Sequence, residues 1–298
     1  MHRPGLYTAI ITPFSPDGRE IDIAAFRTLV KRQIDGGVQG IVVVGTTGEL
    51  PTVSPGEREL LIREAKDISQ GKILIMAGCG SSCTRTTIEQ ARATERMGAD
   101  ALQISPPAYN RPSQEGIFSH FSAIHDAISI PLFVYNIPSR TGVNIEPKTV
   151  ERLLKLERCV GLKEASGNLL QLMDIMEIVS ALKKPVTILS GDDLLALPSI
   201  VLGAHGVMSV IGNLLPKETN ALIMNALEGK EQKASKALYS LKKLMQTCFL
   251  DANPVPIKYM LSKYGLAHER CRLPLTPLSF QNKESIDALL KSTNFKEL

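Results

Sequence analysis

The amino-acid sequence predicts an α/β protein: a (β/α)8 TIM barrel followed by a small C-terminal helical region. Eight short apolar runs start mostly about 30 residues apart, the length of one strand–helix unit, and helix-start signals lie between them. No strand pattern follows Gly229, which predicts the helical region. An open, doubly wound sheet is the competing architecture, but eight alternating units favour a closed barrel.

The eight apolar runs are the expected strands of the barrel. They start near Leu6, Gly40, Ile73, Ala101, Ile130, Val160, Thr187 and Gly206. Between the second and third runs, Ser54 and Glu57 form a capping box, with Pro55 at the first helical position. Ser113 opens another predicted helix, whose apolar residues recur on one face.

Three amphipathic patterns follow the barrel. They cover residues 231–250, 254–264 and 283–293, and we expect three helices packed against the barrel. We therefore divide the chain into a barrel domain with the active site, residues 1–229, and a C-terminal three-helix region, residues 230–298.

The composition argues against several classes of protein. The 298 residues are 44% hydrophobic and 21% charged, and 34 basic and 30 acidic residues are interspersed to give a net charge of +4. The sequence has no long basic run, so we do not expect a nucleic-acid partner. The five cysteines include no Cys-x-x-Cys pair, which argues against a disulfide framework or structural zinc. With no apolar run of ~18 residues and no secretory signal, we expect a soluble, cytoplasmic protein without a membrane partner.

Lys163 is the most informative residue, because it lies near the end of the apolar sixth run. Strand alternation places Gly161 and Lys163 on one face, and Val160 and Leu162 on the other. Burial would lower the pKa of Lys163 from ~10.4 toward neutrality. A neutral amine can form a Schiff base with a keto acid. The alternatives are a lysine that reaches solvent or pairs with Glu164.

Other candidate residues follow other strands, where barrel enzymes hold their chemistry. After the second run, Thr46 and Thr47 lie between glycines and could cradle a carboxylate, although an ordinary strand-to-helix turn fits as well. After the fourth, a proline-rich loop presents Tyr109. The fifth ends at Tyr135, whose phenol could relay a proton or simply be a satisfied core group.

Two further strand ends offer binding groups. Arg140, between turn residues, could hold a carboxylate through two hydrogen bonds or lie on a surface loop. Gly191 leaves room for a ligand after the seventh run, where Asp192 or Asp193 could cap the next helix.

Signals for a cofactor or metal are weak. The segment 78–83 resembles a dinucleotide-binding turn only in part, because Cys83 stands where the third glycine belongs. His120 and His125 have the only spacing close to a metal pair, and it is a poor one. We expect neither a metal nor a cofactor.

Three segments together resemble the dihydrodipicolinate synthase family, one of the class I pyruvate-dependent lyases that include N-acetylneuraminate lyase. They are Gly-Thr-Thr-Gly-Glu (45–49), Tyr-Asn-Ile-Pro-Ser-Arg-Thr-Gly (135–142) and Gly-Leu-Lys-Glu-Ala-Ser-Gly (161–167). The resemblance covers essentially the whole chain, including Asn-Pro-Val-Pro-Ile-Lys (253–258). It implies condensation of pyruvate with L-aspartate 4-semialdehyde, on the route to diaminopimelate and lysine, by a homotetramer of paired tight dimers.

The resemblance also implies roles for single residues. Lys163 would form a covalent imine with pyruvate, and Tyr109, from across a dimer interface, would relay protons with Thr47 and Tyr135. The remaining matches concern binding: Thr46 and Thr47 for the pyruvate carboxylate, Arg140 for the semialdehyde carboxylate, and Gly191 and Met208 as backbone borders of the imine pocket.

The resemblance implies an effector site in lysine-inhibited relatives, and this chain differs from those relatives at five positions of that site. They are Pro55, Arg58, Ser82, Thr86 and Ala108. The departures predict weak or absent inhibition by L-lysine. Two other functions stay open: a pyruvate aldolase acting on a sugar acid, and a binding or regulatory barrel without turnover. Arg140 favours the synthase over the sugar-acid aldolase.

Overall fold

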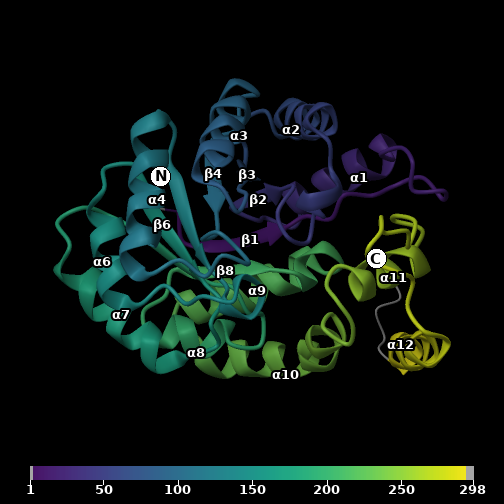
Figure 1. The fold of residues 1–298 in the computed structure, drawn as a ribbon. Helices are drawn as coiled ribbons and strands as arrows, with labels where there is room; N and C mark the ends of the chain where they lie inside the picture. The colour runs from purple at the N-terminus through teal and green to yellow at the C-terminus, as the bar shows by residue number, and fades with distance from the viewer. Residues whose placement is uncertain (1–2, 293–298) are drawn as a thin grey trace.

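Eight parallel strands close into a barrel in the chain order β1 to β8 (Figure 1). The computed structural model describes residues 3–292; residues 1–2 and 293–298, at the two ends of the predicted domains, lie outside the described part. The closed barrel is confirmed and the open sheet is wrong. Within the described residues, no helix is long and apolar enough to cross a membrane.

Every predicted strand lies within two residues of its expected start. The strands are β1 (Gly5–Ala9), β2 (Gly40–Val43), β3 (Leu74–Gly78), β4 (Ala101–Ile104), β5 (Leu132–Asn136), β6 (Cys159–Glu164), β7 (Thr187–Ser190) and β8 (Gly206–Ser209). Because all eight run in parallel, their carboxyl ends form a single rim.

Helices surround the barrel, as its outer apolar surface requires. Up to residue 227 they are α1 (Ile23–Asp35), η1 (Leu50–Thr52), α2 (Pro55–Ser69), α3 (Thr84–Arg96), α4 (Gln114–Ala127), α5 (Pro138–Thr141), α6 (Pro147–Lys155), α7 (Leu169–Ala181), α8 (Ala196–Val201), η2 (Ile211–Asn213) and α9 (Pro216–Leu227). The capping box of Ser54 and Glu57 is confirmed at α2, and Ser113 caps α4 by accepting from Gly116 N–H.

A separate apolar cluster fills the barrel interior. Its buried members are Tyr7, Val42, Leu74, Met76, Ala101, Phe133, Leu189 and Met208. Larger clusters lie elsewhere, mainly between the strands and the surrounding helices. The interior is therefore a packed core rather than a pore, so a ligand must bind at one end of the barrel.

The predicted face of Val160 on β6 is wrong. Leu162 packs in an outer cluster as predicted, but Val160 packs against the interior cluster. The pairing of β5 with β6 shifts register there, from Leu132 opposite Cys159 to Phe133 opposite Gly161. One extra residue in β6 reverses the alternation, as in a β-bulge. Beyond the bulge the predicted alternation holds.

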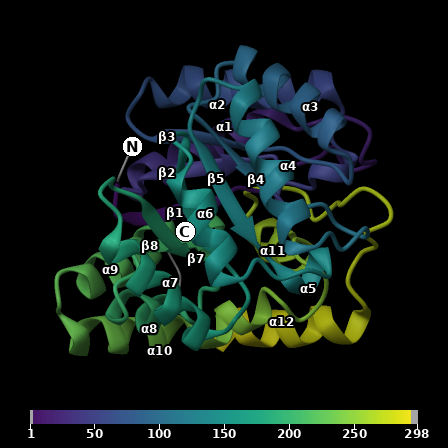
Figure 2. The same ribbon diagram turned by 60° about the vertical axis from the view of Figure 1, so that its left-hand side comes forward.

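Three helices follow residue 229: α10 (Glu231–Thr247), α11 (Val255–Lys263) and α12 (Phe280–Ser292). Figure 2 shows α11 close to α5, at the carboxyl rim of the barrel. The contact is specific, because Arg140 Nη2 of α5 donates to the Asn253 carbonyl, 3.3 Å away, just before α11. The division into two domains at residue 229 stays a prediction.

Candidate active site

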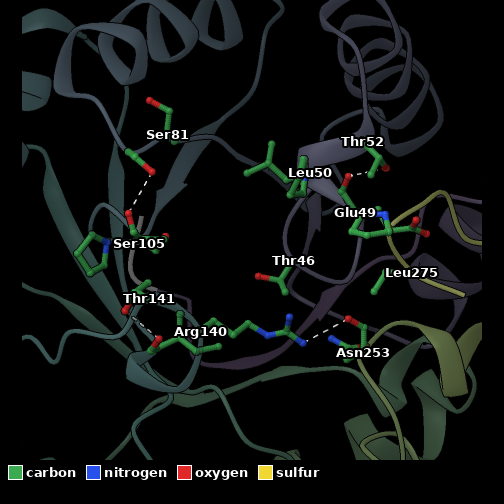
Figure 3. A pocket seen from close by; sticks show the side chains of 17 residues that line it. Thr46, Glu49, Leu50, Thr52, Ser81, Ser105, Arg140, Thr141, Asn253 and Leu275 are labelled. Atoms are coloured by element: carbon green, nitrogen blue, oxygen red, sulfur yellow. Dashed lines mark hydrogen bonds between the residues drawn. The ribbon is translucent and has the colours of Figure 1, made fainter. Parts of the chain in front are cut away.

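A cavity of about 390 Å³ lies at the carboxyl rim of the barrel (Figure 3). Loops after β2, β3, β4 and β5 form part of its wall, which includes Thr46, Ala108 and Arg140. The rest of the wall comes from beyond residue 229, with Asn253 and Leu275. The barrel alone therefore does not complete this site.

Lys163 is buried just inside that rim, one residue before β6 ends, with 5% of its surface exposed. It lies opposite Tyr135 on β5 and Leu189 on β7. Its Nζ atom is 4.3 Å from the centre of the Tyr135 ring. Among the described residues, no hydrogen bond or ion pair of this amine is found. Lys163 does not itself line the 390 Å³ cavity.

Glu164 does not neutralise Lys163. Its side chain lies on the opposite face of β6, where one carboxylate oxygen accepts hydrogen bonds from Asn136 Nδ2 (2.9 Å) and Gln171 Nε2 (3.2 Å). The other oxygen accepts from the Ser166 N–H at 2.7 Å. Both alternative readings of Lys163, exposure to solvent and pairing with Glu164, are therefore wrong.

Gly191 makes room for the lysine. A Cβ atom at this position would lie 2.9 Å from Lys163 Cε and 2.5 Å from Ala165 Cβ. Both separations are too short, so any larger residue would displace the lysine or the backbone. Met208 has its side chain in the barrel interior, with Sδ 2.6 Å from Gln103 Nε2.

The loop after β2 has an unusual backbone that presents Thr46 and Thr47. Val44 has a φ of +53°, a left-handed conformation that costs a β-branched residue about 1–3 kcal/mol. Thr46 lines the cavity, whereas Thr47 is buried and its Oγ1 accepts from Asn253 Nδ2 at 2.9 Å. The loop therefore combines a strained backbone with a hydroxyl that a distant segment holds, and its role as a carboxylate cradle stays a prediction.

Arg140 lies in α5, which begins at Pro138, the first turn after β5. Its side chain is exposed but extends along the cavity wall toward Asn253 (Figure 3). The hydrogen bond to the Asn253 carbonyl uses only Nη2, and no other hydrogen bond of this guanidinium is found among the described residues. Its remaining donors can face a ligand in the cavity.

Tyr109 is not brought to the other candidate residues within this chain. It is 93% exposed and has a φ of +73°. The loop around it is nevertheless fixed, because Asn110 Nδ2 donates to the Ser82 carbonyl and Ser82 Oγ donates to the Ala108 carbonyl. An exposed aromatic side chain on a fixed loop is what a dimer contact needs, and that role stays a prediction.

Comparison with known proteins identifies the family. The profile of the dihydrodipicolinate synthetase family matches residues 3–293. The chain belongs to the dihydrodipicolinate synthase family. A 4-hydroxy-tetrahydrodipicolinate synthase from Protochlamydia amoebophila is 43% identical over 290 residues, covering 97% of this chain and 96% of that one.

Solved structures of dihydrodipicolinate synthases agree with this placement. The enzyme from Methylacidiphilum fumariolicum SolV superposes with a TM-score of 0.93 at 43% identity, covering 98% of this chain and 96% of that one. A monomeric dihydrodipicolinate synthase variant has a TM-score of 0.94 at 34% identity, with coverage of 97% and 96%. Family membership therefore does not fix the oligomeric state.

The positions compared with lysine-inhibited members of the family lie mostly around a second cavity, of about 660 Å³. Pro55, Arg58 and Ser82 line it, Ala108 lines the first cavity, and Thr86 lies on α3. Arg58 is buried, and its Nε atom has no partner among the described residues. Burial lowers the pKa of this guanidinium. The second cavity is therefore bordered by a guanidinium without a hydrogen bond or ion pair among the described residues, and also by Glu89.

Sequence reasoning missed Asn253 and the ion pair that fixes its segment. Glu49 Oε1 lies 2.5 Å from Lys258 Nζ, and both side chains are almost fully buried. Glu49 Oε2 accepts from the Arg272 N–H at 2.9 Å. Asn253 and Lys258 stand in the Asn-Pro-Val-Pro-Ile-Lys segment, which carried the family resemblance, but no single residue in it showed which side chain it would meet.

The expected helix cap after β7 is wrong for Asp193. Its Oδ2 atom accepts from the N–H groups of Val210 (2.9 Å) and Ile211 (3.1 Å), so it joins the ends of β7 and β8. Burial raises the pKa of this carboxyl, which these hydrogen bonds oppose. Asp192 instead bonds locally to the Leu194 N–H, and α8 begins without a side-chain cap.

The described residues contain no group of three or more histidine, cysteine, aspartate or glutamate side chains arranged to hold a metal ion. The groups that gather at the rim are an amine, a phenol, two hydroxyls, an amide and a guanidinium. These suit proton transfer, carboxylate binding and attack on a carbonyl.

Proposed function

We propose that this chain is a lyase that condenses pyruvate with L-aspartate 4-semialdehyde to form 4-hydroxy-tetrahydrodipicolinate, in cytoplasmic diaminopimelate and lysine biosynthesis. One observation carries the proposal: Lys163, a buried amine without a hydrogen bond or ion pair among the described residues, lies at the rim of the barrel against Tyr135. An amine held in this way is suited to attack a ketone.

The amine of Lys163 attacks the ketone carbon of pyruvate, and loss of water leaves an imine. The imine draws electrons from the adjacent methyl group, so loss of one methyl proton gives an enamine. The enamine carbon attacks the aldehyde of the second substrate. The amino group of that substrate then attacks the imine carbon, which closes the ring and frees Lys163. No separate cofactor is needed, because the imine itself accepts the electrons.

The surrounding groups fit these steps. Tyr135 lies against the lysine amine, so its phenol is the proposed proton carrier, with Thr47 and a Tyr109 from a neighbouring subunit completing the relay. Thr46 and Thr47 are proposed to hold the pyruvate carboxylate, with Gly191 and Met208 bordering the imine. We propose a homotetramer of two tight dimers, in which exposed Tyr109 enters the partner's site.

Coupled turnover tests this function against the alternatives. We expect the purified chain to consume pyruvate with L-aspartate 4-semialdehyde much faster than with any sugar-acid acceptor. Faster turnover with a sugar acid would favour the related aldolase. Absence of turnover with every acceptor, together with absence of a pyruvate adduct, would leave a barrel that binds without reacting.

Replacing Arg140 with alanine should weaken binding of the second substrate. A lost charged hydrogen bond costs about 1.5–3 kcal/mol, so KM for the semialdehyde should rise by about 10–100-fold. KM for pyruvate should stay nearly unchanged. Steady-state kinetics with each substrate varied in turn measures both. Arg140→Lys keeps the charge but loses the planar guanidinium, so it should recover only part of the loss. An equal rise in both KM values would contradict the assignment.

L-Lysine should inhibit the enzyme weakly or not at all. All five positions of the effector site differ from the lysine-inhibited pattern, and Ala108 and Ser82 offer few side-chain contacts to a ligand. Initial rates measured with millimolar L-lysine should match those without it, with L-alanine as the matched control. Strong inhibition at sub-millimolar L-lysine would contradict this prediction.

A further inference from the structure

Asn253, just before α11, contacts two of the proposed active-site residues, one through its side chain and one through its backbone carbonyl. Asn253 Nδ2 donates to Thr47 Oγ1 at 2.9 Å, while the Asn253 carbonyl accepts from Arg140 Nη2 at 3.3 Å. Asn253 itself lines the 390 Å³ cavity, and only 6% of its surface is exposed (Figure 3). It therefore lies between the hydroxyl proposed for the relay and the guanidinium proposed for the semialdehyde.

The bond from Asn253 limits the directions in which the Thr47 hydroxyl hydrogen can point. A threonine hydroxyl has one hydrogen to donate and two lone pairs that accept. Because the Asn253 amide occupies one lone pair, the hydroxyl hydrogen must point elsewhere. Among the described residues no acceptor for that hydrogen is found, so it is available to a group in the site.

The placement of Asn253 is costly and well supported. Its Oδ1 atom is buried without a partner among the described residues, which costs about 1–3 kcal/mol. An unsatisfied buried polar atom calls for an explanation, and a role in the site is one such explanation. One helical turn later, Lys258 Nζ bonds Glu49 Oε1 at 2.5 Å, so the loop with Thr47 is tied to the segment with Asn253 at two points.

We propose that Asn253 is a positioning residue: its amide donates to Thr47 and thereby directs the Thr47 hydroxyl hydrogen into the reaction centre, while its carbonyl steadies Arg140. This inference rests on the proposed condensation and adds a residue from beyond the barrel to it. The amide is argued to act through Thr47 and not to touch substrate.

Two variants of Asn253 test the direction of the hydrogen bond. Asn253→Ala leaves the Thr47 hydroxyl free to rotate, and kcat should fall by about tenfold. Asn253→Asp has the same shape, but its carboxylate can only accept from Thr47, which turns the hydrogen away from the centre. We expect kcat to fall by about 100-fold in the aspartate variant. A kcat equal to that of the unaltered chain in Asn253→Asp would overturn the proposal.

A double-mutant cycle separates positioning from a merely structural role. If Asn253 acts through Thr47, then Asn253→Ala should lower kcat no further in a Thr47→Val background. KM for the semialdehyde should change by less than about twofold in Asn253→Ala, because the carbonyl that meets Arg140 belongs to the backbone. Additive losses of kcat would overturn the inference.

Folding and function are controlled separately. Thermal unfolding of each variant, measured without substrates, should show all of them folded at the assay temperature. If the unaltered chain does not turn over pyruvate and the semialdehyde, the proposed condensation fails. If it does turn them over and the cycle is additive, only the role of Asn253 fails.

Discussion

Replacing Lys163 with methionine is expected to lower kcat by at least about 10³-fold, because the reaction loses its covalent intermediate. Methionine keeps a similar length and fits the apolar wall formed by Leu189 and the Tyr135 ring. The variant should therefore fold. Steady-state turnover of pyruvate with the semialdehyde gives the measurement, and circular dichroism and thermal unfolding verify the fold.

Two further variants sharpen this result. Lys163→Arg keeps a long basic side chain at the same place but cannot form an imine, so it should be as inactive as the methionine variant. Lys148→Met removes an exposed lysine on α6 and should leave turnover unchanged. Substantial activity in Lys163→Arg would show that the site needs only a basic side chain there, and not covalent capture.

Replacing Lys258 with methionine is expected to destabilise the protein by about 3–5 kcal/mol, because it leaves the buried Glu49 carboxylate without a counter-charge. Burial lowers the pKa of Lys258, and the adjacent Glu49 carboxylate opposes that shift. The pair joins the loop after β2 to α11, so the loss should also reach Thr47 and Asn253. Urea-induced unfolding measures the stability and kcat measures the effect on the site.

Two control variants are matched to Lys258→Met: one alters the partner in the buried ion pair, and the other removes a lysine from an exposed ion pair. Adding Glu49→Gln to Lys258→Met should restore part of the stability, because a neutral amide replaces the unpaired carboxylate and can still accept from the Arg272 N–H. Lys155→Met removes the partner of Glu151 in an exposed pair on α6 and should change stability little. Equal losses from the exposed and buried variants would contradict this account.

Local sequence signals were sufficient for most of the fold. Apolar runs mark the strands because the parallel strands of a barrel are buried on both faces. The start of α2 was predictable because its capping box is complete within four residues, from Ser54 to Glu57. The burial of Lys163 was predictable, because side-chain alternation near the end of a buried strand determines the face on which the residue lies.

What the sequence did not reveal depends on contacts between distant segments. The altered orientation of Val160 comes from the register between β5 and β6, which is a property of the pair of strands. Glu49 and Lys258 meet across 209 residues of sequence, and Thr47 and Asn253 across 206. No local sequence pattern around any of these four residues indicates its partner. Only the folded structure therefore reveals the ion pair that attaches the Thr47 loop a second time.

The central claim is that Lys163 captures pyruvate covalently, and borohydride trapping tests it most directly. The chain is incubated with pyruvate and sodium borohydride, digested and analysed by mass spectrometry. We predict one reduced pyruvyl group, on the peptide containing Lys163, and no such group in Lys163→Met. An adduct on another lysine, or no adduct while the chain still turns over both substrates, would contradict the account.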